Sequence, residues 1–134
     1  EFLSWILRIK SNIDSGQFKP LMLAAAKALE EEADWHESLN AAYASRRVIA
    51  ERIMEALGCT FDPSQSGLFL WGRISDPEVD SERLADRILD EARVFVTPGF
   101  IFGHNGERYI RISLCAPEEK LSEALDRIRK AMSK

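Results

Sequence analysis

Arg111 is the residue of this chain best suited to bind an anion. It lies within residues 109–114 (Tyr-Ile-Arg-Ile-Ser-Leu), where apolar and polar residues alternate as they do along a β-strand. The alternation places Ile110 and Ile112 on one face and Arg111 on the other. A guanidinium can form two parallel hydrogen bonds to a carboxylate, and a buried charge without a partner is costly. Arg111 is therefore either a carboxylate-binding group or an exposed arginine on the solvated face of an antiparallel sheet.

A defined backbone path is indicated by the residues that precede this strand. Residues 97–99 (Thr-Pro-Gly) end a short apolar strand over 94–97, and residues 104–106 (His-Asn-Gly) are a strong turn signal. Between them, Phe100 and Phe102 belong to an apolar run that is expected in a loop. The two aromatic rings are candidates for lining a substrate pocket, and the alternative is ordinary packing within the loop. So many turn-forming residues indicate a loop with a specific shape.

The order of these features resembles the C-terminal region of the class I/II (fold type I) pyridoxal-phosphate-dependent aminotransferases. In that family a strand, a Pro-Gly pair and an aromatic-Gly pair precede the strand whose arginine binds the substrate's α-carboxylate. Residues 43–47 (Tyr-Ala-Ser-Arg-Arg) begin a stretch that resembles the family's long interdomain helix, and residues 65–71 resemble its strand of a small residue, glycine, apolar residues and an aromatic ring. Residues 81–92 and 118–132 match its last two helices.

The resemblance implies a role for several parts of the chain. Arg111 would bind the α-carboxylate of the substrate. Residues 1–34 would be the end of the large, cofactor-holding domain, and residues 35–134 the long interdomain helix and the small C-terminal domain. A loop at Ser11 and Asn12 would lie near the active site or the dimer interface. The cofactor would be pyridoxal 5'-phosphate, the substrates an amino acid and a 2-oxo acid, and the enzyme a homodimer.

The lysine that holds the cofactor is expected outside this chain. In the family it lies in a Ser-x-x-Lys-like segment ahead of this region. The lysines of this chain, none of which has that context, are Lys10, Lys19, Lys27, Lys120, Lys130 and Lys134. The chain also begins inside an amphipathic helical pattern, with neither an initiator Met nor an N-cap residue ahead of Phe2. We therefore predict a C-terminal fragment that is inactive as a transferase by itself.

Composition excludes several classes of protein. The 134 residues carry a net charge of -4, which argues against a nucleic-acid-binding surface. No segment approaches the roughly 18 apolar residues that a membrane span requires, so no membrane partner is expected. Cys59 and Cys115 have neither metal-ligand spacing nor a disulfide framework, which predicts no metal site and favours the reducing cytoplasm.

The remaining polar residues of note have structural interpretations. His104 is expected to be a plain turn residue, and neither a Ser-His-Asp arrangement nor a Gly-x-Ser-x-Gly elbow exists, which excludes serine hydrolysis. Ser81 is expected as a helix N-cap, with Asp80 as its competitor for that role.

Two other kinds of function stay open from the sequence. The chain could instead be a non-catalytic α+β interaction domain whose Arg111 is solvated or recognises an acidic peptide. Another activity of the same fold (a lyase step, decarboxylation or acyl condensation) is the second alternative.

Hydrophobic periodicity predicts an α+β fold in which helices pack on one side of a small, mostly antiparallel sheet. The expected helices span 2–10, 19–32, 34–57, 81–92 and 118–132, and the expected strands lie near 59–61, 68–74, 94–97 and 109–114. A polar break is expected over residues 11–16, and the alanine-rich helix that follows is expected to pack closely. Gly58 is expected to end the long helix. Alternation directs Arg108 away from Arg111, so we expect it to be a surface charge and not half of a paired arginine clamp.

Overall fold

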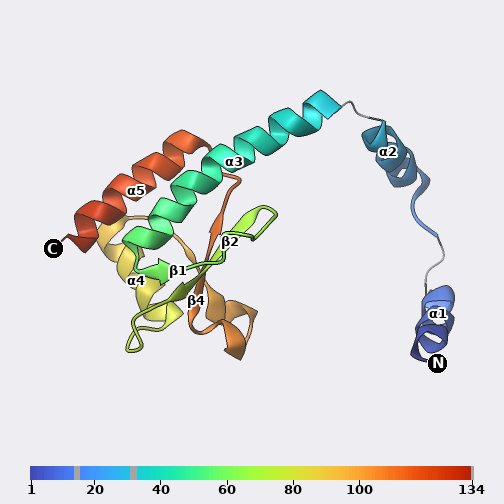
Figure 1. Cartoon of the computed structure of the whole chain (residues 1–134). Helices are drawn as coiled ribbons and strands as arrows, with labels where there is room; N and C mark the ends of the chain where they lie inside the picture. Colours follow the sequence, from blue (N-terminus) through green and yellow to red (C-terminus); the bar gives the residue numbers. More distant parts are fainter. Residues whose placement is uncertain (14–15, 31–32, 134) are drawn as a thin grey trace. The chain divides into compact units, whose positions relative to one another are not determined.

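The computed structural model describes residues 1–13, 16–30 and 33–133, and it divides into two units, Glu1–Ser38 and Leu39–Lys134 (Figure 1). The first unit contains α1 (Phe2–Ile13), α2 (Lys19–Leu29) and the beginning of α3 (Ala33–Ala56). Neither α1 nor α2 buries a residue. The alanine-rich helix α2 was expected to pack closely, but it does not. Its apolar side chains are exposed, for example Leu29 at 88%.

The expected break after Lys10 is wrong for its first three residues. Ser11, Asn12 and Ile13 form the last turn of α1. The hydroxyl of Ser11 donates to the Arg8 carbonyl at 3.0 Å, and the Asn12 amide donates to the same oxygen at 2.8 Å. Polar side chains that bond back to the preceding turn can remain inside a helix, which turn propensity alone does not capture. The remainder of the expected break at residues 14–15, and the helix end expected at 31–32, lie outside the described residues.

The second unit is built on a four-stranded antiparallel sheet with the order β1-β2-β4-β3. Its strands are β1 (Cys59–Thr60), β2 (Phe69–Ile74), β3 (Thr97–Pro98) and β4 (Tyr109–Ser113). The core forms between one face of this sheet and the helices α3, α4 (Ser81–Ala92) and α5 (Glu118–Met132). Its buried members include Met54, Leu70, Ile88, Ile110 and Ile128. The predicted α+β fold, with helices on a small antiparallel sheet, is confirmed.

Helix ends in this unit follow local chemistry. Helix α3 is followed by Gly58, whose φ of +67° lies in the left-handed region that glycine adopts at little cost. Helix α4 is capped by Asp80, whose carboxylate accepts a hydrogen bond from the Arg83 amide at 2.8 Å. Asp80 and not Ser81 is thus the N-cap. Ser81 is instead fully buried, and its side chain has a different partner.

The segment expected as a strand over 94–97 is mostly without strand pairing. Only Thr97 and Pro98 pair with β4, opposite Arg111 and Ile110. Helix α4 ends at Arg93 in a left-handed conformation, so residues 94–96 carry the chain back to the sheet before pairing begins. The loop that follows consists of two short 3-10 helices, η1 (Gly99–Phe102) and η2 (His104–Gly106). The loop of specific shape that the sequence predicted is thus built from tight 3-10 turns.

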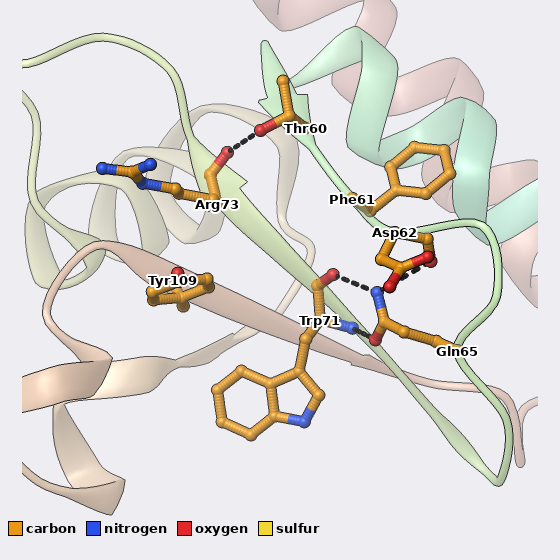
Figure 2. Close-up of a pocket in the computed structure, with 7 residues that line it drawn as sticks. All are labelled: Thr60, Phe61, Asp62, Gln65, Trp71, Arg73 and Tyr109. Carbon is orange, nitrogen blue, oxygen red and sulfur yellow. Dashed lines mark hydrogen bonds between the residues drawn. The ribbon is translucent and has the colours of Figure 1, made fainter.

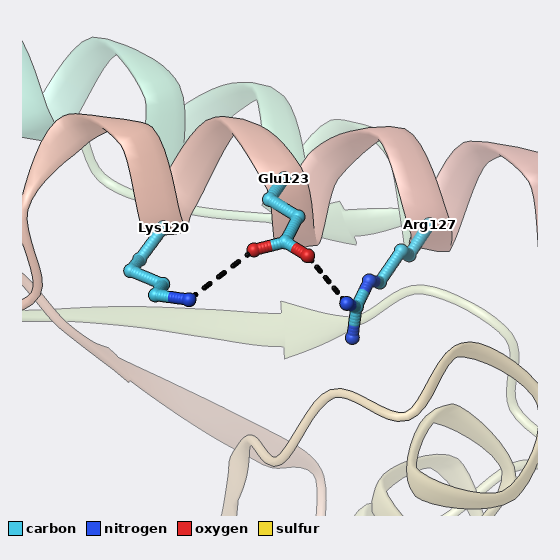
Figure 3. A network of polar contacts seen from close by, with 3 residues as sticks. All are labelled: Lys120, Glu123 and Arg127. Carbon is cyan, nitrogen blue, oxygen red and sulfur yellow. Dashed lines mark hydrogen bonds and ion pairs between the residues drawn. The ribbon is translucent and has the colours of Figure 1, made fainter.

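The outer side of α5 carries a network of charges that contributes little to the core. Glu123 accepts from Arg127 and pairs with Lys120, whose Nζ lies 3.5 Å from a Glu123 oxygen (Figure 3). The charge of Arg127 and then that of Lys120 lower the pKa of Glu123 below its ordinary value. All three side chains are solvent-exposed, and surface pairs of this kind stabilise a fold weakly. Among the described residues, no helix has the length and apolar character needed to cross a bilayer.

Candidate functional site

Arg111 lies in the middle of β4 on the face of the sheet opposite the core. Its guanidinium carbon is 4.2 Å from the centroid of the Phe69 ring and 4.5 Å from that of Phe102. The Trp71 ring lies farther away, at 5.9 Å. A cation near the face of an aromatic ring is attracted by the ring's quadrupole, most strongly where water is excluded. The three rings therefore hold the guanidinium in place without neutralising its charge.

The guanidinium of Arg111 has capacity for a further partner. Its Nε atom is buried and has no hydrogen-bond partner. In the part of the chain that the structure describes, no carboxylate lies within ion-pair distance of Arg111. A planar carboxylate can accept two parallel hydrogen bonds from such a group. The arrangement is thus chemically suited to bind a carboxylate ligand.

One hollow is lined by Arg111 itself, and a second is lined by its strand partner Trp71. Arg111 lines a pocket of about 340 Å³ together with Thr97, Ser113 and the aliphatic part of Lys120 near the start of α5. The second hollow, of about 490 Å³, lies over β1 and β2 and does not include Arg111. Figure 2 shows its lining residues, Thr60, Phe61, Asp62, Gln65, Trp71, Arg73 and Tyr109. The ring of Trp71, which lines this second hollow, also contacts Phe102, one of the rings beside Arg111.

The loop that carries Phe102 is packed backbone against backbone. A Cβ atom added to Gly99 would lie 2.3 Å from the Gly106 carbonyl oxygen, and one added to Gly106 would lie 2.0 Å from that of Gly99. The buried hydroxyl of Ser81 accepts a hydrogen bond from the Phe100 amide at 3.3 Å. The Ser81 amide in turn donates to the Glu107 carbonyl at 2.8 Å. Ser81 thus ties the loop to the first turn of α4, a role that neither an N-cap nor a nucleophile would have.

Arg108 has a structural role that the sequence did not indicate. Its guanidinium donates to the carbonyl oxygens of Ile74 at 3.0 Å and Pro77 at 3.1 Å, and to those of Asp76 and Val79. The expectation of a surface charge is therefore wrong, because the side chain is half-buried and ties down the turn after β2. Its partners are carbonyls about thirty residues earlier in the chain, and no local sequence pattern reveals such a contact.

The other sequence candidates are dispersed. Phe102 touches Arg111, whereas Phe100 lines a separate hollow of about 260 Å³ beside Asp80 and Glu82. Ser11 and Asn12 belong to the first unit, where both side chains donate to the Arg8 carbonyl within α1. His104 lies in η2, exposed, with its Nδ1 2.7 Å from a Glu107 carboxylate oxygen.

Other chemically active groups do not form a second site. Lys10, Lys19, Lys27, Lys120 and Lys130 are all exposed. Burial raises the pKa of the Cys59 thiol to about 11, so that thiol stays protonated at neutral pH, whereas Cys115 is exposed. No group of three or more His, Cys, Asp or Glu side chains suited to a metal ion occurs among residues 1–13, 16–30 and 33–133.

Comparison with known proteins identifies the family. The sequence model of the family Aminotransferase class I and II matches residues 1–128. The LL-diaminopimelate aminotransferase of Aquifex aeolicus is 34% identical over 129 residues, which cover 96% of this chain and 33% of that protein. The aromatic-amino-acid aminotransferase 2 of Thermococcus litoralis is 34% identical over 84% of this chain and 29% of its own length. The chain thus spans about a third of the length of these relatives.

Solved structures agree with the sequence relatives. The aromatic aminotransferase from Pyrococcus horikoshii superposes with a TM-score of 0.71 at 35% identity, covering 82% of this chain and 30% of that one. A probable N-succinyldiaminopimelate aminotransferase from Thermus thermophilus gives a TM-score of 0.74 at 30% identity, covering 96% of this chain and 34% of its own. Sequence and fold agree over most of the chain, and this protein belongs to the class I and II aminotransferase family.

Proposed function

We propose that this chain is the C-terminal region of a pyridoxal-phosphate-dependent aminotransferase in which Arg111 binds the α-carboxylate of the substrate. The observation that carries the proposal is the guanidinium of Arg111, held between Phe69 and Phe102 with a buried Nε that lacks a partner. A bidentate contact to a carboxylate would satisfy this group and orient the substrate. The intact enzyme would transfer an amino group between an amino acid and a 2-oxo acid.

The residues of this chain fit the substrate and not the cofactor. Its described lysines are all exposed, and they lie on α1, α2 and α5 without the Ser-x-x-Lys context expected of the cofactor's lysine. We therefore propose that the rest of the enzyme supplies the lysine and the phosphate-binding groups, and that this chain alone does not transaminate. Pyridoxal phosphate, when bound, supplies the electron sink for the transfer. The contribution of Arg111 is to fix the carboxylate and thereby the direction of the reacting Cα bonds.

The wider assignments of the proposal follow from the family. Residues 1–34 would complete the large domain, and residues 35–134 would form the long interdomain helix and the small domain. Ser11 and Asn12 would lie near the active site or the dimer interface of a homodimer, and Phe100 and Phe102 would border the substrate. The enzyme would act in the cytoplasm, a reducing compartment that suits the two free cysteines.

Replacement of Arg111 in the full-length enzyme tests the proposal. Arg111→Ala should lower kcat/KM for an amino acid by about 2–5 kcal/mol of transition-state stabilisation, the range for truncating one partner of a desolvated charge pair. Arg111→Lys should recover only part of the loss, because an ammonium lacks the planar two-bond fork. An amine substrate without the α-carboxylate should be affected little by either change.

Arg73→Ala is the matched control, since Arg73 lies on the same face of the sheet, on the neighbouring strand, and is exposed. Arg73→Ala should change kcat/KM by no more than about twofold if the loss caused by Arg111→Ala does not come simply from removing a positive charge from this face of the sheet. Equal losses with both kinds of substrate in folded Arg111→Ala would refute the carboxylate assignment. That result would favour the solvated arginine of an interaction domain. Amino-acid consumption without a matching amino transfer would instead favour a lyase, decarboxylase or acyl-condensing activity.

A further inference from the structure

The side-chain amide of Gln65 replaces a missing strand partner beside Trp71. Strand β1 pairs with β2 only at Cys59 and Thr60, opposite Ile74 and Arg73. Farther along this edge of β2, the Trp71 amide donates to Gln65 Oε1 at 2.9 Å, and Gln65 Nε2 donates to the Trp71 carbonyl at 2.9 Å. Figure 2 shows both bonds running between the Gln65 amide and the Trp71 backbone. The backbone on both sides of the Trp71 Cα is thereby held by one side chain.

This pairing determines how Trp71 faces Arg111. The two residues are direct partners in the β2–β4 ladder. Because the Trp71 amide and carbonyl are both directed to Gln65, on the edge away from β4, they do not bond to β4. The Trp71–Arg111 pair is therefore a non-hydrogen-bonded pair, the kind in which opposing side chains lie closest together.

The position of Gln65 is itself fixed by the loop between β1 and β2. A carboxylate oxygen of Asp62 accepts from the Ser64 amide at 2.8 Å and from the Ser64 hydroxyl at 2.7 Å. These bonds lower the pKa of Asp62 below its ordinary value. The Asp62 carbonyl then accepts from Gln65 Nε2 at 3.2 Å. An Asx turn of this kind holds a loop in one conformation, so the amide of Gln65 is presented to Trp71 in a defined orientation.

The indole of Trp71 transmits this order to the arginine. Its ring meets the ring of Phe102 edge to face, with 5.2 Å between the centroids and 66° between the planes. Phe102 in turn lies 4.5 Å from the guanidinium of Arg111. Phe102 is 51% exposed, so it depends on Trp71 for support on that side.

We propose that Gln65 is a positioning residue for carboxylate binding, which acts through Trp71 and Phe102 on the orientation of Arg111. The proposal rests on the assignment of Arg111 to the substrate carboxylate. Among the described residues, Gln65 forms no hydrogen bond with Arg111 or Phe102, and it precedes the paired part of β2. Its role is to complete the edge of β2 where β1 has ended.

Gln65→Met in the full-length enzyme removes both hydrogen bonds to the Trp71 backbone, together with the bond to the Asp62 carbonyl, and keeps the length of the side chain. We expect KM for the amino acid to rise roughly three- to tenfold, the range for a residue that modulates a site without touching the ligand, while kcat stays within about twofold. The inhibition constant of a simple monocarboxylate competitor should rise by the same factor. Gln65→Asn, which is too short to reach both backbone atoms, should have the same effect.

Two comparisons separate positioning from general destabilisation. Ile128→Val removes one buried methyl group from α5, distant in the sequence from Gln65, and should lower stability while leaving KM unchanged. In an Arg111→Ala background, Gln65→Met should change kcat/KM by less than about twofold, because the residue through which it acts is gone.

The outcomes distinguish this inference from the proposed function. If Arg111→Ala selectively impairs carboxylate substrates but folded Gln65→Met and Gln65→Asn leave KM and the inhibition constant unchanged, the positioning role is refuted and the carboxylate assignment stands. The positioning role is also refuted if Gln65→Met lowers kcat/KM by the same factor in the Arg111→Ala background as in the unchanged enzyme, since Gln65 would then act independently of Arg111. If Arg111→Ala shows no selectivity for carboxylates, both proposals fail.

Discussion

Alanine at Gly99 would probe how closely the loop beside Arg111 is packed. The added Cβ would lie 2.3 Å from the Gly106 carbonyl oxygen and 2.6 Å from that of Tyr109. Both oxygens belong to the backbone, so no side-chain rotation can relieve the overlap. We expect Gly99→Ala to lower the free energy of unfolding by about 3 kcal/mol, the upper part of the range for overpacking.

Urea unfolding of the 134-residue chain, followed by far-UV circular dichroism, would measure this loss. With a urea dependence of roughly 1–3 kcal/mol per molar, the midpoint should fall by about 1–3 M. Asn105→Ala is the control in the same loop, because Asn105 is exposed, and its effect should stay within about 0.5 kcal/mol. Gly106→Ala should resemble Gly99→Ala, since its Cβ would meet the Gly99 carbonyl at 2.0 Å.

The double variant provides the sharper test. Gly99 and Gly106 press against each other, so the loop has to open only once to accommodate both methyl groups. The combined loss should therefore be smaller than the sum of the two single losses. A midpoint for Gly99→Ala that equals the midpoint for Asn105→Ala would show that the two backbones do not meet as described, and the argument that this loop holds Phe102 in place would fail with it.

Two further expectations concern the reactive side chains. At neutral pH iodoacetamide should alkylate Cys115 in the folded chain and spare Cys59, whose pKa is raised to about 11 by burial; mass spectrometry showing equal labelling of both would contradict this. Because this folded-state pKa exceeds the ordinary value of 9.0, the free energy of unfolding should decline as the pH rises from about 9 to 11. Pyridoxal phosphate followed by borohydride should modify the exposed lysines of the isolated chain without saturation at one position, whereas saturable labelling of a single lysine would contradict the proposal that the cofactor's lysine lies elsewhere in the enzyme.

Most of the second unit's framework could be predicted from the sequence, because its signals are local. Alternation in residues 109–114 indicated the strand and the face of Arg111, and periodicity indicated the apolar faces of α4 and α5. The bounds of these two helices are those that the family resemblance implied. The glycine after α3 was recognisable from its position behind the last apolar residue of the helix. The errors lie where local signals compete. Ser11 and Asn12, which favour turns, continue a helix by bonding to the preceding turn. The apolar residues at 94–96 resemble a strand but have no strand partner.

The supports of the site could not be predicted, because each is a bond between a side chain and a distant backbone group. Arg108 donates to carbonyls in the turn after β2, Ser81 accepts from the Phe100 amide, and Gln65 pairs with the backbone of Trp71. The backbone amide or carbonyl of a residue of any type can form such a hydrogen bond, so the residue type of the partner does not reveal the contact in the sequence. Only the path of the chain determines which groups meet.

Aromatic rings and not a carboxylate hold Arg111, an arrangement that suits the carboxylate-binding role proposed for it. An Asp or Glu beside the guanidinium would stabilise its charge, but a carboxylate ligand would then have to displace that partner and its binding free energy would be reduced accordingly. The rings of Phe69 and Phe102 attract the cation without accepting hydrogen bonds of the kind that a carboxylate would accept from its N–H groups. The N–H edges stay available while the side chain remains ordered. A guanidinium prepared in this way loses little conformational entropy when a carboxylate arrives, and this preorganisation is the contribution that we assign to this part of the enzyme.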